Sequence, residues 1–574
     1  MEIISKSKYS ILFVLALIFI VRTFFYIQDK SVHFDEIIYP AAGYMYWTEK
    51  AFFINNETPP LSKLVISLPL LFFDLKKPDM SDLNKTDYSY QFILGDRFLK
   101  INKSCREDII LFSRLTAVFI SLIVFFVLYK FVLSIADSVA AVFSVFWLSM
   151  SPNIIAYSGI ANIDIFMCLL IFWFVCVCQI YLKHPTLKNS IFFGIITGLS
   201  FAVKSSAVIE IIIMLSFMVI HYCKTNEPEE NAGIIDFIEM RFRKLSVSFI
   251  VALIILLTSY FFVGIPEYLN GLKDIASGIL KGKTNIFFAG LYSMNGFWFY
   301  YFGVYLLKTA SPEILLALIF IFYIFKHSIL IKYPELFNFI IAAVIIFFAI
   351  SLSNFQTGMR YMLPVYPILA VFLGVTSSFM IKLKGKSRMF LFILTLWMSV
   401  SSFNTHPDYL AYFNELTSLS ADGKNNSNLL ADCNVDWGQD LKKLKTRLNK
   451  YPNSFLVFSY FGNDAPEEYG IEYLELAPRT RIKLNPKTPQ YFDKNRILLA
   501  VSKTNFTGVY YPGDMDLFAW LKILEPVENI GNSILVYDIT NSKIALQKII
   551  EIYEIQNKTK EMEILRFFLS KINS

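Results

Sequence analysis

Charged residues are scarce in this chain of 574 residues: Asp, Glu, Lys and Arg make up 17% of it, whereas a soluble domain carries about 25%. Cysteine is rare too, and the six cysteines form no CxxC pair and no zinc-ligand spacing, so the sequence gives no support to a structural zinc site. No GxGxxG motif occurs, which leaves a dinucleotide or nucleotide-sugar site without support. The shortage of charge points to the lipid bilayer as the environment of much of the chain.

Apolar residues are abundant instead, at 55% of the chain, and Phe alone occurs 57 times. Segments of about 20 apolar residues recur, each long enough to cross roughly 30 Å of hydrocarbon as a helix. We therefore predict a polytopic α-helical membrane protein with about eleven spanning helices. The predicted spans are 9–27, 108–130, 137–151, 163–182, 190–204, 206–222, 245–265, 312–326, 335–353, 362–380 and 389–404.

The first apolar segment follows Lys6 and Lys8, but no small-x-small cleavage site comes after it, so we expect a retained helix rather than a signal peptide. With the amino terminus in the cytoplasm, nearly every short basic loop falls on the cytoplasmic side. The net charge of +7 is then largely explained by topology, and no nucleic-acid partner is needed. We expect a multi-pass protein of the cytoplasmic (inner or plasma) membrane, with its carboxy-terminal domain periplasmic or extracellular.

The predicted organisation has a transmembrane part followed by a polar part. Residues 1–404 form the transmembrane domain, and its first exterior loop, 28–107, contains two amphipathic pieces that we expect to lie in the membrane interface as helices, 35–47 and 61–73. After residue 404, strand-like runs alternate with helical stretches, which predicts an exterior α/β domain over 405–541. A helical tail is expected over 542–574.

Several ionisable residues are not explained by the positive-inside pattern. The predicted topology brings them to the exterior face of the membrane from distant parts of the chain; they are Asp35, Glu36, Lys63, Asp164, Lys204 and Arg360. Ionisable groups near hydrocarbon depth are costly and indicate function by default. The structural alternatives are that Lys63 and Arg360 extend to the lipid headgroups and that the acidic residues cap helices.

Carboxylates and cations at one membrane face suit the transfer of a sugar from a polyprenyl phosphate. The acceptor hydroxyl needs a base to take its proton, and a carboxylate serves this purpose. The leaving phosphate needs fixed positive charge, which Lys and Arg supply. Because the lipid tail of the donor stays in the bilayer, such a site belongs where membrane helices meet the outer loops.

The chain also resembles a known superfamily in a set of motifs that occur in order. The motifs "HFDE", "ETPPLSK", "SPNIIAYSGIANID", "TGLSFAVKSS" and "GMRYMLPVYP" resemble those of GT-C glycosyltransferases of the family 39 type, which include protein O-mannosyltransferases and the aminoarabinose transferases that modify lipid A. The carboxy-terminal part, with "NVDWGQDLKKLK", is similar to the exterior domain of bacterial phospholipid-carrier-dependent glycosyltransferases.

This resemblance implies an inverting enzyme and a role for each candidate. Asp35 would be the catalytic base with Glu36 beside it, and Asp164 would be a second acidic residue that orients substrate. The implied ligands of the donor phosphate are Lys63, Lys204 and Arg360. Glu57 and Tyr361 are candidates for a further contribution to the site, with no role assigned. The partners implied are a polyprenyl-phosphate sugar and a protein, lipid or glycan acceptor.

A metal is left open by the sequence. Asp35 and Asp164 are the candidate ligands of a divalent cation, if one binds, and no other cofactor is expected. Thr58 stands where the family often has histidine, which removes one candidate base or ligand.

Two other classes of function stay open at this point. A secondary transporter or lipid flippase would place charges near the bilayer midplane and often shows an internal repeat, and no strong repeat is found here. A non-catalytic component of glycan export is the second alternative. The sequence does not identify the sugar, the acceptor or the carrier lipid.

Overall fold

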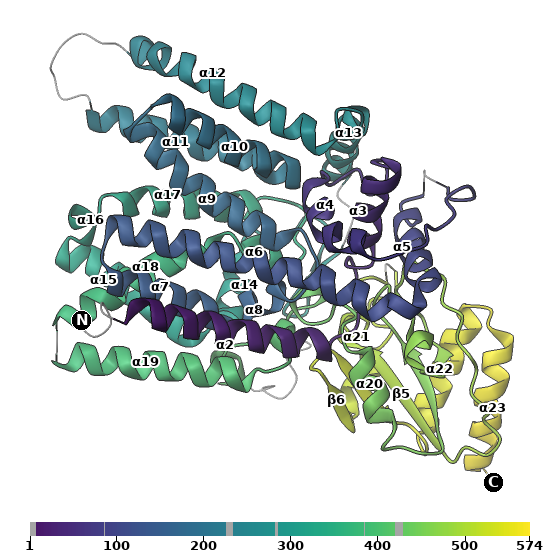
Figure 1. Ribbon diagram of the computed structural model, residues 1–574. Helices are drawn as coiled ribbons and strands as arrows, with labels where there is room; N and C mark the ends of the chain where they lie inside the picture. The colour runs from purple at the N-terminus through teal and green to yellow at the C-terminus, as the bar shows by residue number, and fades with distance from the viewer. Residues whose placement is uncertain are drawn as a thin grey trace.

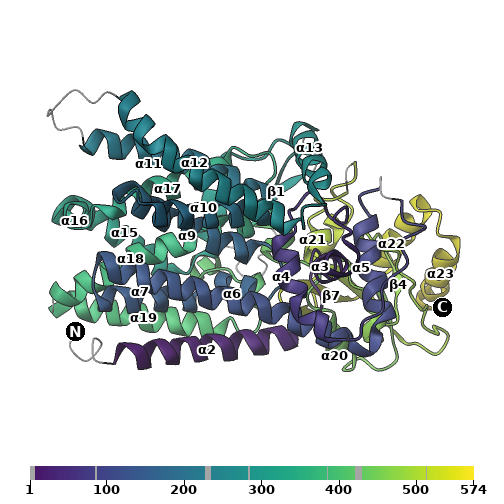
Figure 2. The same cartoon turned by 45° about the horizontal axis from the view of Figure 1, so that its top comes forward.

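The computed structural model describes residues 7–84, 87–225, 234–281, 285–383, 385–419, 429–511 and 513–573. A bundle of long helices forms one end of the molecule, and a five-stranded sheet with its own helices lies at the other end (Figure 1). The first loop, with its helices α3, α4 and α5, lies at the same end of the bundle as the sheet, as Figures 1 and 2 both show. This end of the bundle is therefore where loop, sheet and membrane helices meet.

The bundle contains a helix at each of the eleven predicted ranges. These helices are α2 (Lys8–Asp29), α6 (Arg106–Ile135), α7 (Ser138–Met150), α9 (Asp164–Lys183), α10 (Leu187–Val203), α11 (Ile209–Thr225), α12 (Ile234–Ser259), α15 (Ser311–His327), α17 (Glu335–Ser351), α18 (Val365–Leu383) and α19 (Gly385–Asn404). Leu, Ile, Phe and Val dominate their sequences, and a helix satisfies its own backbone groups where no water is present.

The number of membrane spans is a separate matter. Within the described residues, five helices are long and apolar enough to cross a membrane, and the number rises to seven if two bent helix pairs each count as one span. The bent pairs are α7 with α8 (Pro152–Ser158), at 67°, and α14 (Tyr300–Lys308) with α15, at 115°. The chain is thus a multi-pass helical membrane protein, and the total of eleven spans stays a prediction because several of the helices are short.

The first loop packs against the bundle. Its elements are α3 (Ile38–Glu49), α4 (Leu61–Ser67), the 3₁₀ helix η1 (Leu68–Phe72) and α5 (Tyr90–Ile101). A helix, α3, does lie at the predicted range 35–47, and it is buried along almost its whole length; its position in the membrane interface stays a prediction. Gly43 allows α4 to approach this closely, since a Cβ there would lie 2.0 Å from the carbonyl oxygen of Lys63. By contrast, η1 exposes apolar side chains, with Phe72 90% exposed, as an interfacial segment requires.

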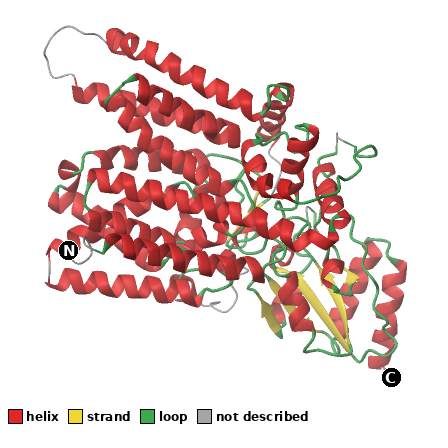
Figure 3. Cartoon of the chain, in the orientation of Figure 1, coloured by secondary structure: helices red, strands yellow, loops and turns green. Residues whose placement is uncertain are grey.

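The segment between α12 and α15 adds small elements at the same end. It contains α13 (Ile265–Lys281), the antiparallel hairpin β1 (Ile286–Phe288) with β2 (Leu291–Ser293), and α14. Strands occur only at this end among the residues that the structure describes (Figure 3).

The carboxy-terminal sheet has the strand order β4-β3-β5-β7-β6. Its strands are β3 (Ser454–Ser459), β4 (Leu474–Glu475), β5 (Arg496–Ser502), β6 (Glu528–Ile530) and β7 (Ile534–Asp538). β3 pairs in parallel with β4 and β5, whereas β7 pairs antiparallel with β5 and β6. The three strand-like runs in the sequence coincide with β3, β5 and β7, and the helix α20 (Leu441–Leu448) precedes them.

The two faces of this sheet have different neighbours because side chains alternate along a strand. Phe455 and Val457 face a core that they share with α22 (Lys543–Ile555) and α23 (Thr559–Asn573). Leu456 and Phe458 belong to the large core that extends into the membrane helices. Residues 543–573 are helical, as predicted, but they do not form a separate tail beyond residue 541. They cover one face of the sheet and belong to the same domain.

Buried ion pairs join the carboxy-terminal part to the bundle. Lys30, just after α2, contacts Asp408 and Asp440, each at 2.6 Å between the ammonium and a carboxylate oxygen. Arg106, at the start of α6, pairs with Asp464. These contacts fix the sheet against the end of the bundle at which the predicted site residues lie.

Candidate functional site

Asp35 and Arg360 form an ion pair at the junction of the bundle, the first loop and the carboxy-terminal part. The Nη1 of Arg360 donates to Oδ2 of Asp35 at 2.7 Å, and both side chains keep partial exposure, 15% for Arg360 and 20% for Asp35. Asp35 lies in the turn before α3, and its backbone carbonyl accepts a hydrogen bond from Ile38. Its carboxylate is not a helix cap, so the capping alternative does not explain it.

Arg360 lies in the 3₁₀ turn η4 (Met359–Met362) between α17 and α18, and its guanidinium is held on several sides. Nε and Nη2 both donate to Oγ1 of Thr357, at 3.3 and 3.2 Å. The indole ring of Trp437 lies 5.1 Å from the guanidinium carbon, within the range of a cation–π contact. Gly358 has φ of +83°, and a Cβ there would lie 2.7 Å from Sγ of Cys433, so glycine is required for this close approach.

A second ion pair, between Lys204 and Asp164, lies beside the first. The Nζ of Lys204 donates to Oδ1 of Asp164 at 2.9 Å. Lys204 has an extended backbone in the break between α10 and the 3₁₀ turn η3 (Ser205–Val208), whereas Asp164 is the first residue of α9. Lys204 reaches Asp164 from this extended backbone conformation, which a continuous helix from α10 into η3 would not allow.

Tyr361 connects the two ion pairs. Its ring centroid lies 4.4 Å from Nζ of Lys204 and 5.4 Å from the guanidinium carbon of Arg360. Two cations near one ring face would repel each other in a low-dielectric site, and the two carboxylates relieve this repulsion. The result is a cluster that we call the Asp35 cluster, made of Asp35, Asp164, Lys204, Arg360 and Tyr361.

Sequence reasoning missed two aromatic neighbours of this cluster. Burial raises the pKa of Tyr39 well above its ordinary value, and the charge of Asp35 raises it further, which places Tyr39 near the cluster. Tyr39 lies only four residues from Asp35, at the start of α3, but Asp35 precedes that helix and helical spacing gave no signal for their approach. Trp437 gave no signal either, because its contact with Arg360 depends on how the carboxy-terminal part docks.

Glu36 does not join the Asp35 cluster, although it is adjacent to Asp35 in sequence. Its oxygens accept hydrogen bonds from Nε and Nη2 of Arg114, at 2.8 and 2.7 Å, and from the backbone N–H groups of His33 and Ala161. Burial raises the pKa of Glu36, but the charges and hydrogen bonds of Arg114 and His33 together outweigh it and hold the pKa well below its ordinary value. Because the carboxylate of Glu36 is fully buried and engaged, these contacts do not support the predicted catalytic role.

Lys63 also lies apart from the cluster. Its ammonium donates to four oxygens of Asn55 and Thr58, at 2.6 to 3.0 Å, and its side chain is fully buried. Burial lowers its pKa well below the ordinary value. The predicted role in phosphate binding does not fit these contacts, because no donor is left for a ligand.

Glu57 is buried next to this loop. Oε1 of Glu57 accepts from Nδ2 of Asn55 at 3.1 Å and from Nε2 of Gln91 at 3.5 Å. Burial raises its pKa, and the charge of Asp35 acts in the same direction. Glu57 therefore lies within electrostatic reach of Asp35, but its hydrogen bonds to Asn55 and Gln91 hold it outside the Asp35 cluster.

The carboxylates of the site do not offer a good set of metal ligands. Asp35 and Asp164 are each paired with a cationic side chain, and Mg²⁺ and Ca²⁺ prefer several oxygen ligands. Among the described residues, one group of three carboxylates has the spacing of a metal site, Asp29, Asp408 and Asp440. Lys30 contacts all three, at 3.2, 2.6 and 2.6 Å, so a cation already fills that position.

The fold and this cluster are those of a multi-pass membrane protein with paired acids and cations at one end of its helices. Residues 98–231 match the family model described as dolichyl-phosphate-mannose-protein mannosyltransferase. The matched residues include the motifs "SPNIIAYSGIANID" and "TGLSFAVKSS", and in this part the chain is similar to that family of mannosyltransferases. No curated protein sequence matches the chain significantly.

Two solved structures are among those that match this chain. The crystal structure of ArnT from Cupriavidus metallidurans bound to undecaprenyl phosphate is 13% identical with a TM-score of 0.45, and the match covers 93% of this chain and 99% of that chain. The oligosaccharyltransferase of Archaeoglobus fulgidus in complex with Zn and sulfate is 12% identical with a TM-score of 0.43, and the match covers 88% of this chain and 69% of that chain.

Proposed function

We propose that this protein is an inverting glycosyltransferase that moves a sugar from a polyprenyl phosphate to an acceptor hydroxyl at the exterior face of the membrane. The observation that carries the proposal is the Asp35 cluster, which combines a base with two cations where the membrane helices meet the outer parts. The family model supports the glycosyltransferase class. The basic loops support an orientation in which this end faces the exterior.

In the proposed reaction, Asp35 takes the proton of the acceptor hydroxyl. The hydroxyl oxygen forms a bond to the anomeric carbon while the bond from that carbon to the phosphate oxygen breaks. The polyprenyl phosphate leaves with the electron pair, so no general acid is needed and no covalent intermediate forms. One displacement of this kind inverts the anomeric centre.

Arg360 and Lys204 bind the donor phosphate in this scheme. Each already holds a carboxylate, and a phosphate competes for the same guanidinium and ammonium donors. When the phosphate engages Arg360, its ion pair with Asp35 opens and the carboxylate becomes available to the acceptor. Asp164 keeps Lys204 in position and has no proton-transfer role.

The test is an assay of transfer by the purified full-length protein. A panel of radiolabelled polyprenyl-phosphate sugars, with undecaprenyl and dolichyl carriers, is incubated with the protein and a membrane extract. We expect a labelled product from at least one donor, with inverted anomeric configuration. A labelled product with retained configuration would contradict the single displacement, and no product from any donor would contradict the assignment itself.

A further inference from the structure

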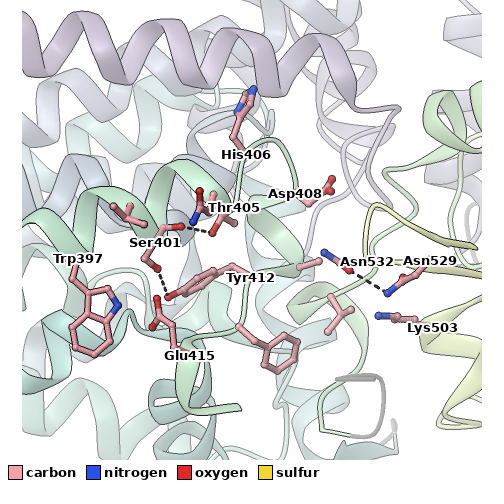
Figure 4. Close-up of a pocket in the computed structure, with 15 residues that line it drawn as sticks. Trp397, Ser401, Thr405, His406, Asp408, Tyr412, Glu415, Lys503, Asn529 and Asn532 are labelled. Carbon is pink, nitrogen blue, oxygen red and sulfur yellow. Dashed lines mark hydrogen bonds between the residues drawn. The ribbon is translucent and has the colours of Figure 1, made fainter. Parts of the chain in front are cut away.

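A cavity of about 460 Å³ lies away from the Asp35 cluster, where the last bundle helix meets the carboxy-terminal sheet (Figure 4). Val435 lines this cavity, whereas Trp437, two residues further on, packs on Arg360. The segment that contains both residues therefore separates the cavity from the cluster. The two are distinct sites on opposite sides of one stretch of chain.

Lys503 enters the cavity from the sheet. It follows the end of β5 and begins the short helix α21 (Lys503–Phe506). The residue is only 3% exposed, and Figure 4 shows Nζ directed into the cavity that Lys503 lines. Within the described part of the chain, the charge of Asp436 acts on this ammonium, but neither a hydrogen bond nor an ion pair holds Nζ. A lysine whose stem is buried and whose ammonium opens onto a polar cavity indicates a site for an anion.

The lysine keeps its charge near neutral pH. Burial lowers the pKa of Lys503 to about 8, and the charge of Asp436 acts in the opposite direction. At pH 7 most of the ammonium groups are therefore protonated and able to bind an anion. Asp436 does not satisfy this ammonium, because its carboxylate accepts from the backbone N–H groups of Gly438 and Thr504 instead.

The acidic groups of the cavity are bound elsewhere. Asp408 contacts the ammonium groups of Lys30 and Lys443, so its charge is compensated from outside the cavity. Glu415 accepts a hydrogen bond from Oγ of Ser311 at 2.6 Å. Glu415 lies across the cavity from Lys503 (Figure 4). With a phosphate bound at Lys503, its carboxylate is placed to accept from a hydroxyl or ammonium group of the same headgroup.

The opposite wall of the cavity belongs to a lipid-facing helix. Trp397 and Val400 of α19 line the cavity, and Val400 is itself 49% exposed. The same helix exposes Phe392 and Leu396, and tryptophan is typical of the membrane–water interface. An amphiphile thus has an apolar surface for its tails directly beside a polar cavity for its head.

We propose that this cavity binds the phosphate-bearing headgroup of a membrane glycerophospholipid, with Lys503 as the ligand of the phosphate and the acyl chains against α19. Lipid binding here does not depend on glycosyl transfer at the Asp35 cluster. It would anchor the carboxy-terminal sheet to the bilayer at a point where α19 and the sheet meet.

The proposal is tested by thermal unfolding of the purified full-length protein with dihexanoyl phosphatidylglycerol, and in parallel with inorganic phosphate at equal concentration. We expect the lipid to raise the midpoint of unfolding until the shift reaches a plateau. Inorganic phosphate should need at least a tenfold higher concentration to give the same shift. Because methionine has a similar length and no charge, K503M should lose this response. Its lipid-free midpoint should equal or exceed that of the wild type, since the burial that lowers the pKa of Lys503 also makes its charge costly in the folded protein.

Two variants complete the test. K442M removes an exposed lysine that pairs with Glu107 on the surface, and it should respond to lipid like the wild type. V400W fills the cavity from the side of α19 without touching Lys503, and it should lose the response as well. An unchanged response in both K503M and V400W would overturn the proposal. An equal response to lipid and inorganic phosphate would show a free-anion site and would overturn it too.

Discussion

Asp35 and Arg360 are 325 positions apart in the chain, yet their side chains form an ion pair at 2.7 Å. Both are partly exposed, so a ligand is able to reach either partner. Arg360 is also held by Thr357 and Trp437. A pair that is positioned but not fully buried is able to open without loss of the surrounding structure, which is what competition by a phosphate requires.

We expect D35N to lower the turnover of glycosyl transfer by about 100-fold or more, because an amide cannot take the proton of the acceptor. Binding of the donor lipid should be unchanged or tighter, since Arg360 no longer has to leave an ion pair. The measurement is kcat together with the dissociation constant of the donor. D82N is the matched control, because Asp82 is an exposed residue of the same loop that pairs with Arg97. Equal turnover in D35N and D82N would rule out Asp35 as the base.

Removing the charge of Arg360 or Lys204 should mainly weaken binding of the donor lipid. R360M and K204M should each weaken donor binding by about tenfold to hundredfold, because a charged hydrogen bond contributes about 1.5–3 kcal/mol. K183M is the control: Lys183 pairs with Glu335 at the far end of α9 and should leave donor affinity unaltered. The measurement is the donor affinity of each variant, determined by competition with polyprenyl phosphate. A donor affinity of R360M equal to that of the wild type would contradict the role of Arg360 in phosphate binding.

The ring of Tyr361, rather than its hydroxyl, should matter for the cluster. Y361F keeps the aromatic face near Lys204 and Arg360, and we expect donor affinity close to that of the wild type. Y361L removes the face, and the loss should be about threefold to tenfold, as expected for a partly exposed cation–π contact. If both variants behave alike, the ring does not position the two cations.

Glu36 should matter for stability and not for chemistry. Neutralising it in E36Q leaves the buried Arg114 without its counter-charge, which costs about 3–5 kcal/mol of unfolding free energy. E107Q, at an exposed position, should change the unfolding free energy by less than about 1 kcal/mol. Activity per folded molecule should survive in E36Q, and a folded but inactive E36Q would restore a catalytic role.

The same residue predicts a pH dependence. The pKa of Glu36 is lowered in the folded protein, because the charges and hydrogen bonds of Arg114 and His33 together outweigh the effect of burial. Its contribution to stability is therefore full above the ordinary carboxyl pKa of about 4.5 and is lost as the pH falls below that value. The difference in unfolding midpoint between wild type and E36Q should shrink on acidification below about pH 4.5; a difference that grows instead would contradict the lowered pKa.

The orientation is tested by cysteine labelling in a variant without native cysteines. A cysteine at Asp82 should react with an impermeant maleimide in sealed spheroplasts, whereas one at Lys386 should react only after permeabilisation. Both positions are exposed, so accessibility reports the side of the membrane and not burial. The reverse pattern would invert the topology.

Much of the site was visible in the sequence because ionisable residues are rare in apolar segments and stand out there. Asp35, Asp164, Lys204 and Arg360 were chosen on that ground, and the structure brings them into two adjacent ion pairs. Glu36 and Lys63 met the same criterion, yet they are bound by Arg114 and by the loop at Asn55. A buried charge that is structurally satisfied has the same sequence signature as one that awaits a ligand.

The sequence alone determined that the chain is a helical membrane protein, because long apolar segments have no other stable form in hydrocarbon. It also indicated three of the five strands of the carboxy-terminal sheet, β3, β5 and β7, since each is a local apolar run. Only the tertiary structure decided which charges neutralise one another, that α3 is buried, and that Trp437 packs on Arg360. Those outcomes depend on contacts between segments hundreds of residues apart, and a side chain's neighbours across such distances are set by packing and not by local sequence pattern.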